Sequence, residues 1–123
     1  NASGQDIVPQ AWQERYRQYI LGLDYDAKMQ EAHDQIWEFH NELDRLGVRH
    51  IFFNGNNHFG GIADQKDWGR SYIGPYDPGQ TFDSILKSNG YTTLSRDNWH
   101  FGKDAHSFFH RFMLQYIINN KFI

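Results

Sequence analysis

The chain has 123 residues, which suits one domain with a modest hydrophobic core and excludes two. Its 12 basic and 15 acidic residues are scattered and give a net charge of -3, so the sequence does not indicate nucleic-acid binding. Cysteine is absent, which excludes disulfides and thiolate metal sites and favours a cytoplasmic or virion location. The apolar runs are short, and we expect neither a membrane-spanning segment nor a membrane partner.

Two helical patterns occupy the first 46 residues. Pro9 suits the first turn of a helix over 9–21. Asp24 suits the N-cap of a second, longer helix over 25–46. The apolar residues of this second helix recur in steps of three and four, which places them on one face: Met29, Ala32, Ile36, Phe39, Leu43 and Leu46. We expect His33 and His40 to border that face.

The next segment, residues 50–54, reads His-Ile-Phe-Phe-Asn and is apolar on both faces. This pattern is typical of a strand in a parallel sheet that helices cover on both sides. A long loop over 54–80 follows, and loops of this length in compact domains are usually functional or disordered. Its aromatic residues either pin the loop onto the core or form a platform on which a sugar stacks: Trp68, Tyr72 and Tyr76.

The remaining elements are a short helix over 81–88, a weak strand over 91–94 and a last helix over 104–118. The chain thus offers one strong strand, although a strand needs neighbours to bond its backbone groups. We therefore expect the missing strands to come from an N-terminal segment of the same protein or from another chain. The lack of an initiator methionine agrees with this, and we expect residues 1–123 alone to fold poorly.

The segment 97–106, Asp-Asn-Trp-His-Phe-Gly-Lys-Asp-Ala-His, is the most informative part of the sequence. Asp97 precedes His100 by three residues, just ahead of a helix that Asp104 can cap. At this spacing a carboxylate can bond one imidazole nitrogen and leave the other facing outward as a general base. In that arrangement Trp99 anchors the turn in the core. The alternative is a capping Asp beside a structural His.

This segment resembles the C-terminal Asp-x-x-His block of the SGNH (GDSL-like) hydrolases, in which an Ala-His or Gly-His step opens the last helix. Asp97, His100 and the pair Ala105-His106 match that block. The long helix and the apolar strand precede it in the same order, so the resemblance covers residues 25 to 120 or so. It implies a three-layer α/β/α fold and serine ester or acyl hydrolysis without a cofactor, with His100 as the base and Asp97 as its partner. The style of the sequence also resembles SGNH-like proteins of tailed bacteriophages.

The chain departs from that family where the nucleophile is expected. No Gly-Asp-Ser turn follows an early strand, and the family's oxyanion-hole Gly and Asn have no counterpart. The resemblance therefore implies that the nucleophile and the oxyanion donors lie upstream of residue 1. Asn54, Asn56 and Asn57 can bind a substrate from the end of the strand, or are simply turn residues that tolerate left-handed conformations.

The sequence is compatible with two functions. One is an active hydrolase that acts on an ester or glycan-linked substrate. The other is a structural or glycan-binding protein, such as a virion component, that keeps the fold without activity. His106 and His110 share a face of the last helix, but no carboxylate completes a metal motif. We therefore expect ordinary histidines there, and no metal or other cofactor.

Overall fold

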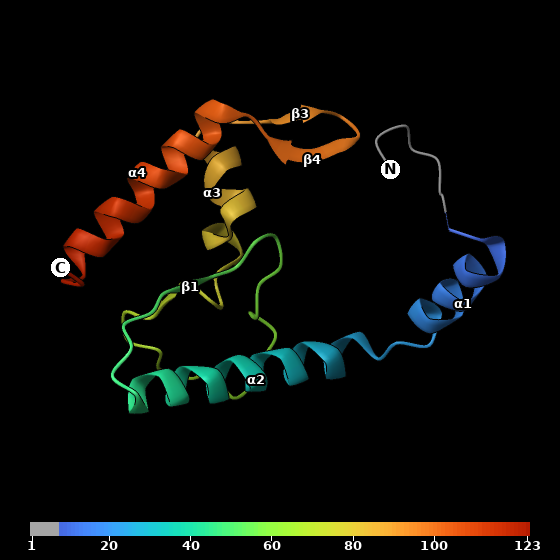
Figure 1. The fold of residues 1–123 in the computed structure, drawn as a ribbon, viewed down its shortest axis with the longest axis horizontal. Coiled ribbons are helices and arrows are strands. Elements are labelled where there is room, and N and C mark those ends of the chain that lie inside the picture. The colour runs from blue at the N-terminus through green and yellow to red at the C-terminus, as the bar shows by residue number, and fades with distance from the viewer. Residues whose placement is uncertain (1–7) are drawn as a thin grey trace.

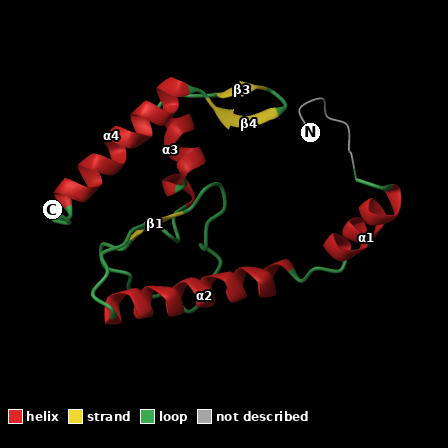
Figure 2. Cartoon of the chain, viewed as in Figure 1, coloured by secondary structure: helices red, strands yellow, loops and turns green. Residues whose placement is uncertain are grey.

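The computed structural model describes residues 8–123, which form a mixture of helices and small sheets (Figures 1 and 2). No helix in this range is long and apolar enough to cross a membrane. The elements follow one another in the order α1 (Gln10–Leu21), α2 (Tyr25–Arg45), β1 (Phe52–Phe53), β2 (Tyr72–Ile73), the 3-10 helix η1 (Pro78–Gln80), α3 (Phe82–Ser88), β3 (Thr93–Ser95), β4 (Asn98–Phe101) and α4 (Lys103–Asn119).

Helix α1 begins one residue later than expected, and α2 begins directly after its predicted cap. Pro9 directly precedes α1, and the Asp24 carboxylate accepts a hydrogen bond from the Ala27 amide at 3.0 Å at the start of α2. Helix α1 has no buried residue. In α2 the buried side chains are His33 and His40, whereas Phe39 is 53% exposed. The expected apolar face is therefore partly wrong, because the helix turns its two histidines toward the core.

Strand β1 is shorter than the expected strand over 50–54, and the expected loop over 54–80 contains β2 and η1. The two strands pair in parallel, with Phe52 opposite Tyr72. Helix α2 lies on one face of β1, where the rings of Phe39 and Phe52 are 5.9 Å apart. Helix α4 lies on the other face, where the rings of Phe53 and Phe109 are 5.1 Å apart. Figure 1 shows β1 between these two helices.

The described residues form no sheet of more than two strands. The three-layer α/β/α sheet expected from the sequence is therefore not present in residues 8–123, and the layers are limited to the short β1–β2 pair between helices. The reason is local: β1 and β2 contain two residues each, and the segments around them are loop or helix.

The C-terminal third consists of α3, an antiparallel hairpin of β3 and β4, and α4. Thr81 caps α3, where its hydroxyl accepts a hydrogen bond from the Ser84 amide at 3.0 Å. Helix α4 starts one residue earlier than expected, with Gly102 rather than Asp104 at the N-cap position. Asp104 stays in the first turn, where a negative charge favours the helix.

Two hydrophobic clusters stabilise the described residues. One joins α3, β4 and α4, and its buried members are Ile85, Leu86, Phe101, Ala105 and Phe109. The other joins α2 to the segment between β1 and η1, and its buried members are Phe59, Ile62, Trp68 and Tyr72. Together they hold β1 between a helix on each side.

Candidate functional site

The Asp-x-x-His block lies on the β3–β4 hairpin, directly ahead of α4. Asp97 falls in the turn, and His100 lies on β4. Both residues are exposed, and in residues 8–123 no hydrogen bond or ion pair joins the Asp97 carboxylate to the His100 ring. The backbone amide of His100 donates instead to the Asn98 side chain at 2.8 Å.

The strand geometry explains this separation. Successive side chains of a strand point to opposite faces, so positions three apart project to opposite sides unless a turn brings them together. Trp99 is 82% exposed, so its expected role as a core anchor is wrong. The core contact of this strand comes from Phe101, which is 6% exposed. A hollow of about 430 Å³ lies beside the hairpin, between residues 90–94 and 102–105, and neither Asp97 nor His100 lines it.

Asn54 is buried at the end of β1, whereas Asn56 and Asn57 are exposed. The Asn54 side chain donates to the Pro75 carbonyl at 3.2 Å and accepts a hydrogen bond from the Tyr72 hydroxyl. Burial raises the pKa of Tyr72 to about 12, with a smaller contribution from the neighbouring Tyr76. The Tyr72 hydroxyl therefore keeps the proton that it donates. Both polar ends of the Asn54 side chain therefore bind protein groups.

His33 is fully buried and belongs to a closed hydrogen-bond network. The Tyr76 hydroxyl accepts hydrogen bonds from the Lys66 amide at 2.7 Å and from the Trp68 indole at 2.9 Å. With both lone pairs used, it donates to His33 Nε2 at 2.8 Å. His33 consequently carries its proton on Nδ1, which faces the Asp34 carboxylate at 3.1 Å.

This network decides between the two roles proposed for the aromatic loop residues. Trp68 and Tyr72 are each 5% exposed. The Trp68 ring packs edge-on against Trp37 of α2, with the ring centres 4.9 Å apart. A buried ring offers no face to a sugar, so these residues pin the loop onto α2.

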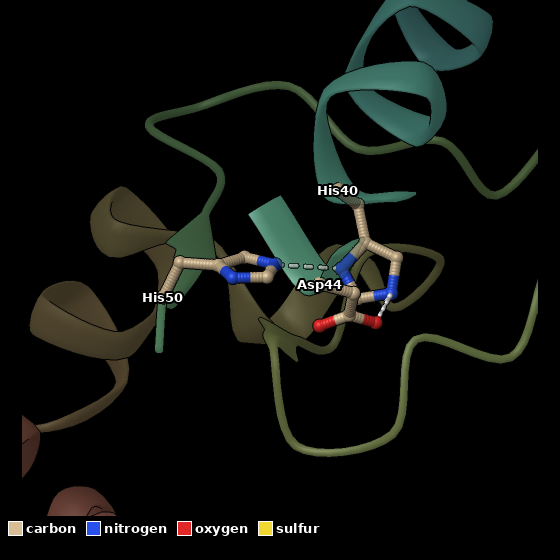
Figure 3. Close-up of side chains that lie close together, drawn as sticks. All are labelled: His40, Asp44 and His50. Atoms are coloured by element: carbon tan, nitrogen blue, oxygen red, sulfur yellow. Dashed lines mark hydrogen bonds and ion pairs between the residues drawn. The ribbon is translucent and has the colours of Figure 1, made fainter. Parts of the chain in front are cut away.

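A second histidine cluster joins the end of α2 to the segment before β1 (Figure 3). His40 Nδ1 lies 2.7 Å from His50 Nε2, and His40 Nε2 lies 3.3 Å from the Asp44 carboxylate. His50 Nδ1 lies 2.8 Å from the Val48 carbonyl oxygen. These three side chains and the trio His33, Asp34 and Asp64 are the sets of three potential metal ligands within residues 8–123.

The sequence reading missed the cluster of His40, Asp44 and His50. One signal was present, because residues four apart on a helix are neighbours and His40 and Asp44 have that spacing. His50 is brought to them by the turn after α2, where Gly47 adopts a φ of 72°. The spacing of His50 in the sequence does not predict that contact.

No family model matches this chain, and neither the curated proteins nor the solved structures contain a significant match to it.

Proposed function

We propose that this chain is the C-terminal part of an SGNH-like serine ester or acyl hydrolase, with His100 as the general base and Asp97 as its partner. The nucleophilic serine and the oxyanion donors then belong to a segment N-terminal to this chain. The observation that carries the proposal is the packing order. A parallel strand is covered on both faces by helices, and the Asp-x-x-His block comes directly before the helix that covers one of them.

The β1–β2 pair supports the three-layer part of the proposal. Parallel strands occur almost only in larger sheets whose two faces are both covered by helices. A pair of two-residue strands is too small to be stable alone in water. Phe53 is 45% exposed, although it lies on a strand between α2 and α4. Additional strands beside β1 would complete the sheet and cover this ring.

The accessibility of His100 supports the chemical part. Neither ring nitrogen of His100 has a hydrogen-bond partner in the described part of the chain, and the residue is exposed. Such a ring can take the proton of a serine hydroxyl as the oxygen attacks an ester carbonyl. It then gives that proton to the departing alcohol, and water releases the acyl group by the same route.

The alternative is an inactive structural or glycan-binding protein with the same fold. The observation that favours it is the missing hydrogen bond between Asp97 and His100, together with the exposed Trp99 ring on the same hairpin. An exposed indole is a surface on which a sugar can stack.

The test is hydrolysis of a chromogenic short-chain ester by the complete protein, including any segment that precedes this chain. Loss of a triad histidine removes most of the catalytic rate, so His100→Ala should lower kcat by about a thousandfold or more. Because His100 is exposed, the melting temperature should stay nearly unchanged. His110→Ala, which removes an exposed histidine of α4, is the matched control and should keep the wild-type rate. An unchanged rate in His100→Ala would end the proposal, and a wild-type protein without esterase activity would favour the binding alternative.

A further inference from the structure

We propose that His40 and His50 form a two-histidine site for a divalent transition metal such as Zn²⁺, in which Asp44 orients His40. This site is separate from the hydrolase proposal, since it lies at the end of α2 and not on the hairpin that carries Asp97 and His100 (Figure 3).

The two imidazole rings are held in place by aromatic neighbours. His40 is 5% exposed and stacks on Trp37, with ring centres 5.3 Å apart and an angle of 28° between the planes. On another side it meets Trp68 at 5.3 Å. The His50 ring centre lies 4.9 Å from that of His40 and 5.3 Å from that of Phe52. These contacts preorganise the rings in the way that a binding site requires.

The outer neighbours of the two rings supply the acceptors that a metal-binding pair of tautomers needs. The Val48 carbonyl can only accept a hydrogen bond, so His50 Nδ1 at 2.8 Å from it is a donor. The Asp44 carboxylate lies 3.3 Å from His40 Nε2 and can accept its proton when His40 is protonated on that nitrogen. In these tautomers the nitrogens without a proton are His40 Nδ1 and His50 Nε2, which face each other at 2.7 Å.

A separation of 2.7 Å needs either a proton or a metal ion between the two nitrogens. With the proton on His40 Nδ1, the contact is a hydrogen bond to His50 Nε2; a metal ion would replace that proton and bind both nitrogens. Metal-binding histidines almost always donate their other N–H group to a carboxylate or a backbone carbonyl, and here one ring has each kind of partner. Val48 therefore sets the tautomer that a metal needs in His50, and Asp44 offers the acceptor that His40 needs in its metal-binding tautomer.

The geometry fits an ion after a small movement. Zn–N bonds of about 2.0–2.1 Å place two nitrogens of a tetrahedral site about 3.3 Å apart. The rings would have to separate by about half an ångström from their present contact. His50 is the ring that can move, because it is only partly buried and belongs to the connection before β1. A hollow of about 210 Å³ lined by Asp44 and His50 gives the ion access and leaves room for water in the remaining positions.

The charged groups around the site influence its affinity for a metal ion. Arg49 and Arg70 line the same hollow and oppose the binding of a cation. Both guanidinium groups are held by backbone carbonyls near the C-terminus: Arg49 by Phe122, and Arg70 by Asn120 and Lys121. The two imidazole ligands and the nearby carboxylate would favour the ion, whereas the two arginines would weaken its binding. We expect a micromolar rather than a nanomolar dissociation constant.

The other cluster, His33 with Asp34 and Asp64, does not suit a metal. Binding through His33 Nδ1 would move the ring proton to Nε2, toward the Tyr76 hydroxyl. That hydroxyl already accepts two hydrogen bonds and would lose the acceptor for its own proton.

The experiment is a titration of the complete, tag-free protein with Zn²⁺ by isothermal calorimetry, with Co²⁺ absorption spectra as a second readout. We expect one equivalent to bind, with a tetrahedral Co²⁺ spectrum. His50→Asn, which alters the rim of the site, should weaken binding at least tenfold. Asp44→Asn should weaken it by about tenfold or more, as loss of an outer-shell partner does. His110→Asn, at an exposed position of α4, should bind like the wild type.

Two results would overturn the proposal. The first is the absence of saturable Zn²⁺ binding below millimolar concentration, which would mean that the facing nitrogens share only a proton. The second is equal affinity in His50→Asn and the wild type, which would place the ion elsewhere. Circular dichroism of each variant would establish that its helices are intact.

Discussion

Replacing Asn54 by alanine should reduce the free energy of unfolding by about 2–4 kcal/mol. The Asn54 side chain ties the end of β1 to Tyr72 and Pro75. The Pro75 carbonyl keeps a hydrogen bond from the Phe59 amide at 2.8 Å, so there the loss is one bond, about 0.5–1.5 kcal/mol. The Tyr72 hydroxyl has no other hydrogen-bond partner in residues 8–123 and becomes a buried donor without an acceptor, which costs about 1–3 kcal/mol.

Urea unfolding followed by tryptophan fluorescence measures this effect. Asn57→Ala is the matched control, because Asn57 is exposed in the same loop and its loss should change stability by less than about 0.5 kcal/mol. In a double-mutant cycle, Asn54→Ala and Tyr72→Phe should be non-additive by about 1–2 kcal/mol, since each removes the other's partner. Additive effects would refute the bridge. A stable Asn54→Ala protein with weakened substrate binding would instead restore the substrate-binding role.

Two further predictions concern the core. Leu86 is completely buried among the side chains of α3, β4 and α4, so Leu86→Ala should lower the free energy of unfolding in urea by about 2–5 kcal/mol. The control is Leu94→Ala, because Leu94 is 64% exposed and its loss should change this free energy by less than about 0.5 kcal/mol. Tyr72 has its pKa raised from the ordinary 10.0 to about 12, so the folded protein holds the phenol proton more tightly than the unfolded chain. The stability that this contributes is complete below about pH 10 and is lost as the pH rises through about 12. Tyr72→Phe should flatten this part of the pH profile of the unfolding free energy, and an identical alkaline slope in both proteins would contradict the argument.

The helices were the most predictable part of the fold because their signals are local. The Asp24 cap and the run of apolar steps predicted α2 to within one residue, and α4 extends one residue beyond its predicted range at each end. The predicted strand over 50–54 includes β1 but is longer than it. Its length depends on its partner β2, twenty residues further along the chain, and the pattern of one strand carries no information about the length of another.

The candidate site was less predictable, for a related reason. The spacing of Asp97 and His100 fits a turn as well as a strand, and the two structures place the side chains differently. His33 and His40 lie on the same helical stripe as the apolar residues of α2, seven residues apart, so their burial could have been read from the sequence. Their partners could not, because Tyr76 and His50 reach them through loops.

The open side of β1 offers a direct test of the larger sheet. Backbone groups of successive residues in a strand point to opposite sides, and the Phe52 amide bonds to the Ser71 carbonyl at 2.7 Å. The Phe53 amide therefore faces away from β2, where the described residues provide no further strand. If an N-terminal segment supplies one, hydrogen exchange at the Phe53 amide should be slow in the complete protein and fast in residues 1–123 alone, whereas exchange at the Leu86 amide inside α3 reports the stability of the rest. Fast exchange at Phe53 in the complete protein, with Leu86 protected, would mean that β1 is an edge strand and that the three-layer sheet is not formed.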